Sequence, residues 1–173
     1  MPDTGAPWNI PYVASSDLVS DWPTDSLALA NAIDAGLDTA YNAGIGSNVE
    51  TGTLSSTFTT TSASLVDTGL ETTITLESAT SSVLLIMQAP SLTTSSGADI
   101  AVLGLTRDAT ALNARAYSQT TVRNAVSMVW VDTPGSVGPH TYKVQALITG
   151  GSTLSMFAAS TARPFITAIE VAA

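Results

Sequence analysis

The chain has 173 residues, no cysteine and a formal net charge of −9 at pH 7. Its length fits one domain or a domain with an appendage, the absence of cysteine excludes disulfides and thiolate metal sites, and the lack of a long apolar run argues against membrane insertion. Residues 1–106 hold eleven acidic residues and no Lys or Arg, so nucleic acid is not an expected partner, and the acidic half either keeps the protein soluble or attracts a basic protein surface.

Residues 1–22 are rich in proline and aromatic side chains and begin with the stretch "PWNIPYV". Proline has no backbone N–H and pushes the preceding residue toward extended geometry, so neither a helix nor a central strand is predicted. An extended segment can lie in a groove of a partner, and Trp and Tyr often anchor interfaces. We therefore predict a docking arm, with folding back onto its own domain as the alternative. Its predicted docking residues are Trp8, Ile10, Tyr12, Val13, Leu18 and Trp22.

Residues 23–51 are predicted to form one helix and a linker. The helix, roughly residues 24–42, has an apolar stripe with spacings of three and four that includes Ile33 and Leu37. Gly36 weakens it by about 1 kcal/mol relative to alanine. A helix of this length is marginal alone, so it must pack on its own domain, on sister helices or on a partner.

Residues 52–173 are predicted to form a β domain, because short runs rich in Thr, Ser and Val alternate with dense turn signals and no helical pattern lies between them. The runs "LETTITL", "AVSMVWV", "TYKVQALI" and "RPFITAIEV" each alternate with the period of a strand. The low-complexity stretch over residues 51–62 is either a linker or a first edge strand, and its threonines favour the strand. The predicted fold class is mainly β, a jelly-roll-like β-sandwich knob preceded by an extended N-terminal arm and one α-helix.

The run "SVLLIMQA" is apolar on both faces, which suits a strand between two sheets or at a subunit interface. In "AVSMVWV", Val129 and Val131 likewise oppose an apolar face. One such face would form a large exposed patch on a monomer, and soluble monomers rarely show such patches. We therefore predict an obligate oligomer whose interface contains Ile33, Leu37, Leu84, Ile86, Val129 and Val131.

The sequence contains no catalytic constellation above background. The single histidine, His140, lies in a turn motif and is predicted to be an exposed polar residue, the alternative being a metal held by three copies of His140 on a symmetry axis. Asp99, Asp108 and Asp132 lie in or near turns, where aspartates usually cap the backbone. No P-loop, zinc-protease, dinucleotide or nucleophile-elbow motif is present. Neither a cofactor, a metal site nor catalytic residues are predicted.

Three stretches of the β region, "LTRDATAL", "WVDTPGSVGPHTYKVQA" and "FITAIEVAA", resemble in their order the knob domains of bacteriophage fibre and appendage proteins. Such knobs are similar to the trimeric jelly roll of the TNF/C1q family. The opening, from "GAPWNIPYV" to "ALANAIDAGLD", resembles the first stretch of small head and tail appendage proteins of phages. The resemblance covers residues 65–173 and the N-terminal stretch, and it implies a homotrimer.

The resemblance implies a non-enzymatic structural virion protein, assembled in the host bacterial cytoplasm, whose arm binds capsid or tail proteins of the same virion. A capsid decoration protein or head fibre is the favoured expectation, since the chain is small and has no long shaft. The alternative is a short tail fibre or tail-tip protein whose knob binds a host receptor or glycan. A third hypothesis is a carbohydrate-processing enzyme, which would need carboxylates that converge in a cleft.

Overall fold

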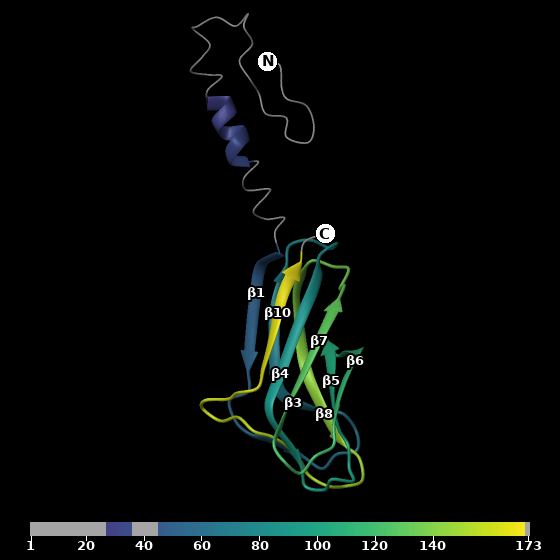
Figure 1. Cartoon of the computed structure of the whole chain (residues 1–173). Helices are drawn as coiled ribbons and strands as arrows, with labels where there is room; N and C mark the ends of the chain where they lie inside the picture. The colour runs from purple at the N-terminus through teal and green to yellow at the C-terminus, as the bar shows by residue number, and fades with distance from the viewer. Residues whose placement is uncertain (1–26, 36–44, 172–173) are drawn as a thin grey trace, which may run out of the picture. The chain divides into compact units, whose positions relative to one another are not determined.

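The computed structural model describes residues 27–35 and 45–171 (Figure 1). The chain divides into two units, Met1–Gly44 and Ile45–Ala173. Within the first unit, residues 27–35 form an α-helix on which Leu27 and Ile33 are exposed. The remainder of the predicted helix, including Leu37, and the whole predicted arm lie outside the described residues.

The second unit is built of antiparallel strands. In chain order they are β1 (Ile45–Thr53), β2 (Phe58–Thr60), β3 (Val66–Leu76), β4 (Ser82–Thr94), β5 (Ala101–Arg107), β6 (Thr110–Ser118), β7 (Asn124–Asp132), β8 (Gly138–Ile148), β9 (Leu154–Met156) and β10 (Phe165–Val171).

The strands form two sheets. One has six strands in the order β1-β10-β4-β9-β2, with β7 paired to β4, and the other has four strands in the order β3-β8-β5-β6. Strands far apart in sequence therefore pair, as β1 does with β10 and β3 with β8 (Figure 1). The mainly β fold, consistent with a jelly-roll-like sandwich, confirms the predicted fold class.

The core lies between the two sheets and follows the alternation of the sequence. Leu70 and Ile74 of β3 and Val144 of β8 are fully buried, as are Leu85 of β4 and Ile166 of β10 from the opposite sheet. Each of these strands directs every second side chain into this core, with the period of two that extended backbone imposes. The buried face of β10 also carries Glu170, whose Oε1 accepts a hydrogen bond of 3.3 Å from the backbone N–H of Glu77.

The first strand begins at Ile45, earlier than the predicted start of the β domain at residue 52. Residues 46–48 are Gly, Ser and Asn, which favour turns, and the register between β1 and β10 is irregular between Ile45 and Val49. Pairing with β10 therefore overrides the weak local preference. The low-complexity stretch is divided between the end of β1 and the short strand β2.

The start of β1 and the end of β10 lie side by side, because Ile45 pairs with Val171. The turns after β3, β5 and β7 lie at this same end, since Val171 pairs with Ser82 of β4, and Gly138 of β8 pairs with Leu76. We call it the C-terminal end of the sandwich. The loops at the other end connect β4 to β5, β6 to β7 and β8 to β9.

Candidate functional site

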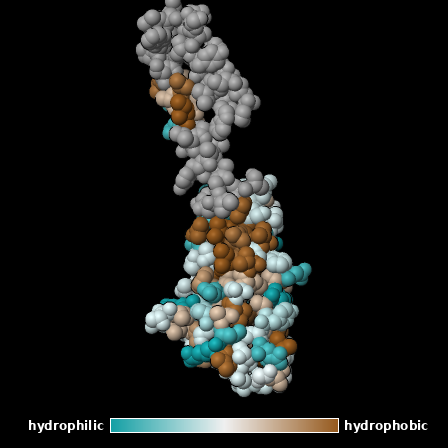
Figure 2. Space-filling model, in the orientation of Figure 1, coloured by the Kyte–Doolittle hydropathy of each residue, from teal (hydrophilic) through white to brown (hydrophobic). Residues whose placement is uncertain are grey.

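The outer side of the six-stranded sheet exposes aliphatic side chains near the C-terminal end. Val129 and Val131 of β7 are 64% and 59% exposed, and Val49 of β1 is 51% exposed, while Leu84 and Ile86 of β4 are half-buried. Figure 2 shows apolar side chains gathered over this part of the sheet. Soluble monomers rarely expose a contiguous patch of this kind.

Cross-strand register makes the patch continuous, because residues that lie directly opposite in neighbouring strands share a face of the sheet. One row across the sheet is Val49, Ile169, Leu84 and Val131. The next row is Thr51, Thr167, Ile86 and Val129. We call these two rows the apolar face.

The surroundings of the apolar face are also free of charge. Flanking it on the same side of the described strands are Thr53, Ser82, Gln88, Ala125, Ser127, Phe165 and Val171, none of which is ionisable. The two threonine hydroxyls of the second row lie 2.9 Å apart and bond to each other. Burying this surface would therefore desolvate few unpaired polar groups and no charge.

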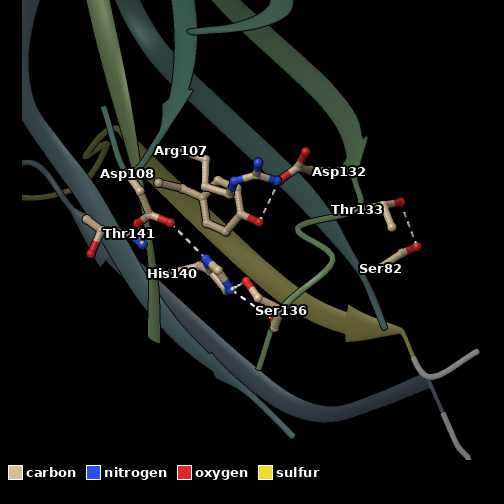
Figure 3. A network of polar contacts seen from close by, with 9 residues as sticks. Ser82, Arg107, Asp108, Asp132, Thr133, Ser136, His140 and Thr141 are labelled. Carbon is tan, nitrogen blue, oxygen red and sulfur yellow. Dashed lines mark hydrogen bonds and ion pairs between the residues drawn. The ribbon is translucent and has the colours of Figure 1, made fainter. Parts of the chain in front are cut away.

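A second feature is a polar network at the C-terminal end (Figure 3). The two-residue turn after β5 places Asp108 beside the start of β8, where its Oδ1 accepts a bond of 2.8 Å from the backbone N–H of Thr141. Its Oδ2 lies 2.7 Å from Nδ1 of His140. Asp108 therefore bonds to the backbone of a strand distant in sequence and not to its own turn, although capping of its own turn is the role that was predicted for it.

His140 is 7% exposed and belongs to β8, so the prediction of an exposed turn residue was wrong. The strand begins at Gly138, despite the turn signals of Gly138 and Pro139, because His140 pairs with Ile74 of β3. Its Nε2 lies 3.1 Å from the carbonyl oxygen of Ser136 and 3.3 Å from the hydroxyl of the same residue. Unprotonated Nε2 can accept a hydrogen bond from the Ser136 hydroxyl, and protonated Nε2 can donate one to the Ser136 carbonyl oxygen. The ring therefore holds the β7–β8 loop in either form.

Asp108, His140 and Ser136 follow one another in the order of a nucleophilic triad, but their accessibility is reversed. In a triad the carboxylate is buried, and the imidazole must reach the substrate. Here the side chain of His140 is 9% exposed and that of Asp108 is 45% exposed. The carbonyl of Ser136 also occupies the nitrogen that would take the proton of the nucleophile. We therefore interpret the network as a structural contact in which His140 holds the β5–β6 turn, through Asp108, and the β7–β8 loop, through Ser136. We call this contact a clamp.

The electrostatics of Asp108 agree with a clamp. Partial burial alone would raise its pKa, but hydrogen bonds from His140 and from the N–H of Thr141, and the charges of His140 and Arg107, outweigh burial and hold the pKa of this carboxyl below its usual value.

Asp132 forms a second clamp within the sandwich. Its Oδ2 accepts a charge-assisted bond of 2.7 Å from Nη1 of Arg107 and a bond of 2.9 Å from the hydroxyl of Tyr142. Burial, and then the hydrogen bond to Asp132, raise the pKa of the Tyr142 hydroxyl. These bonds join the last residue of β5, Arg107, and the last residue of β7, Asp132, to Tyr142 of β8. Asp132 is therefore buried and bonded within the sandwich and is not an exposed turn residue.

The structure brings together four of the predicted interface residues. Leu84, Ile86, Val129 and Val131 lie on the apolar face, while Ile33 lies exposed in the other unit. Leu37 and the predicted docking residues Trp8, Ile10, Tyr12, Val13, Leu18 and Trp22 lie outside the described residues.

Sequence reasoning missed the residues that complete the apolar face. Val49 was assigned to a linker, although it occupies an outward position on β1. The alternation of "RPFITAIEV" puts Ile169 on one face with Phe165, Thr167 and Val171, and in the structure this face is the outer one. The alternation shows which residues share a face of the strand, but it does not show which of the two faces is buried.

A comparison with protein-family models and with curated protein sequences finds no match to this chain. No helix among the described residues is long and apolar enough to cross a membrane. In the same part of the chain, no group of three or more His, Asp or Glu side chains is arranged to hold a metal ion.

Proposed function

We propose that this protein is a structural component of a bacteriophage virion, in which the N-terminal arm attaches the chain to the particle and a homotrimeric β knob is displayed on its surface. The observation that carries the proposal is the apolar face of the six-stranded sheet. The resemblance of the chain to phage appendage proteins supports a role in the virion. The resemblance to trimeric knobs favours an assembly of three copies over one of two. A capsid decoration protein or head fibre is favoured over a short tail fibre.

Charge favours a second copy of this chain as the occupant of the apolar face. Copies with a net charge of −9 repel each other wherever acidic surfaces meet. The apolar face carries no ionisable group, so copies can approach there without like-charge contact. Its aliphatic rows contribute about 25 cal/mol for each Å² of apolar area removed from water. The four-stranded sheet carries the ion pairs of Lys143 and would face solvent.

The test is the molar mass of the full chain by light scattering at micromolar concentration. We expect the mass of a trimer for the parent and of a monomer for Val129→Lys, because a lysine at the β7 end of the second row would bury an unpaired charge at the interface. The matched control is Val122→Lys, since Val122 is 72% exposed in a loop at the opposite end. A folded, monomeric parent would refute the assembly. A Val129→Lys variant that remains trimeric would show that the interface lies on another surface.

Attachment to the particle is tested separately. Removing residues 1–22 should leave the knob folded and its oligomeric state unchanged but abolish binding to empty capsids. Isolated tails are the comparison surface. Full occupancy of the particle by the truncated protein would contradict the docking role of the arm, and binding to tails alone would favour the tail-fibre alternative.

A further inference from the structure

The outer side of the four-stranded sheet displays an aromatic ring among polar groups. Tyr117 of β6 is 65% exposed, and the register places it beside Val102 of β5, which in turn lies beside Leu147 of β8. Both aliphatic neighbours are half-buried. The ring therefore stands at the edge of a short apolar row on a sheet whose outer side is otherwise polar.

The neighbouring row is built around a glycine. Arg115, Gly104 and Gln145 lie side by side on β6, β5 and β8. A Cβ at Gly104 would meet Nη1 of Arg115 at 2.6 Å and Cζ at 3.1 Å. The guanidinium thus rests directly on the backbone of β5, and only glycine leaves room for it there.

Several polar groups in this region have no partner in the described part of the chain. Nη1 of Arg115 donates to the carbonyl oxygens of Leu112 and Ala114 at 3.1 and 3.0 Å, and its other donors are free within the described residues. The amide of Gln145 and the hydroxyl of Tyr117 are likewise not bonded to any described residue. This contrasts with the polar network at the C-terminal end, whose groups bond to one another.

The next row is charged but balanced. Nζ of Lys143 lies 2.7 Å from Oε2 of Glu71 and 3.3 Å from Oδ2 of Asp67. With Arg115, two positive and two negative side chains share this side of the sheet, which is therefore neutral on a chain of net charge −9. A neutral surface does not select a polyanion such as nucleic acid, whose binding needs an excess of Lys and Arg.

We propose that this surface, formed by Tyr117, Val102, Leu147, Arg115 and Gln145 and called the Tyr117 platform, binds a neutral saccharide. A sugar ring has an apolar face that can stack on the exposed aromatic ring, and hydroxyls that both donate and accept hydrogen bonds. Arg115 lies one row from Tyr117 on the same strand, at the roughly 7 Å that separates every second residue. Gln145 lies in the same row as Arg115 but two strands from Tyr117, across β5, so an oligosaccharide that stacks on the ring and extends over β5 can reach both groups. The inference rests on the proposed function, because assembly through the apolar face of the opposite sheet leaves this platform outward.

The experiment is a titration of the full chain, isotope-labelled, with neutral oligosaccharides followed by amide chemical shifts. The probes are a glucan, a galactan and a mannan hexasaccharide, and polygalacturonate is the acidic comparison. We expect at least one neutral probe to shift the amides of β5, β6 and β8 around Tyr117. Tyr117→Ala should weaken that binding about tenfold, and Tyr117→Phe, which keeps the stacking ring, should change it by less than about threefold. Val122→Ala removes an exposed side chain outside the platform and should bind like the parent.

Lack of binding by every neutral probe would overturn the proposal, as would shifts centred on another surface, equal affinity of the Tyr117→Ala variant, or binding of polygalacturonate alone. Light scattering on the same samples separates the two proposals. A monomeric parent that still binds through Tyr117 would refute the assembly and support the platform, whereas a trimer without saccharide binding would do the reverse.

Discussion

At the scale of single residues, the turn between β5 and β6 combines a sterically unfavourable backbone conformation with a side chain that forms stabilising hydrogen bonds. Asp108 and Ala109 have φ values of 47° and 70°, in the left-handed region that side chains other than glycine rarely adopt. Asp108 tolerates this conformation because aspartate can bond locally, and here its carboxylate also holds His140 and the backbone of Thr141. Ala109 has no such compensation.

Ala109→Gly is therefore expected to stabilise the knob by about 1 kcal/mol, because glycine adopts a positive φ without steric cost. The measurement is urea denaturation followed by circular dichroism. The control is Ala111→Gly on β6, an exposed position without positive φ, which should lose about 0.5 to 1 kcal/mol. Equal effects of the two substitutions would show that the turn is not strained.

The lowered pKa of Asp108 predicts how the clamp responds to acid. A carboxyl whose pKa is lower in the folded than in the unfolded protein contributes stability above its unfolded pKa of about 3.9, and this contribution is lost as pH falls through the folded value. Asp108→Asn should therefore be less stable than the parent at pH 7, and the difference should shrink below about pH 4. A constant difference in urea denaturation from pH 7 down to the acid range would contradict this role.

At the scale of elements, the close approach of β1 to β3 is set by one residue. A Cβ at Gly52 would collide with the carbonyl oxygen of Glu71 on β3. Gly52→Ala should lower the free energy of unfolding by about 2 to 4 kcal/mol, because neither backbone can move without breaking its pairing with a neighbouring strand. Gly97→Ala is the control, since the nearest atom to its Cβ would be Cγ2 of Thr121 at 3.9 Å. Equal stability of the two variants would mean that β1 can shift.

Strands with two-residue periodicity were predictable from local sequence. The buried set of Leu70, Ile74 and Leu76 in β3, and that of Tyr142 and Val144 in β8, follow the predicted alternation, because half-buried strands impose this pattern.

Elements and sites fixed by distant pairing were not predictable in the same way. The start of β1 has turn-forming residues and becomes a strand through β10, and His140 is buried because Ile74 and Asp108, the latter 32 residues away, lie against it. The apolar face could be anticipated at Leu84, Ile86, Val129 and Val131, where both faces of a strand are apolar. It could not be extended to Val49 without the register of β1.

At the scale of the whole molecule, the two sheets of the knob have outer sides of different chemistry. One is aliphatic and uncharged, and the other carries ion pairs, an exposed tyrosine and hydrogen-bonding groups that have no partner among the described residues. The proposed assembly would cover the first side and leave the second exposed. The asymmetry links the proposed self-association to the proposed saccharide platform.

Assembly through the knob also predicts how its thermal stability depends on concentration. Residues 45–173 form one compact unit that contains the apolar face and the core, so they should fold and associate without the first unit. Because association is open only to the folded state, the Tm of this fragment should rise with protein concentration. Val129→Lys should remove the dependence, and Val122→Lys, at an exposed loop position outside the apolar face, should preserve it. Calorimetry over a hundredfold range of concentration measures both. A Tm that is independent of concentration in the parent fragment, together with a monomeric mass, would place the driving force for assembly in residues 1–44 instead of in the sheet.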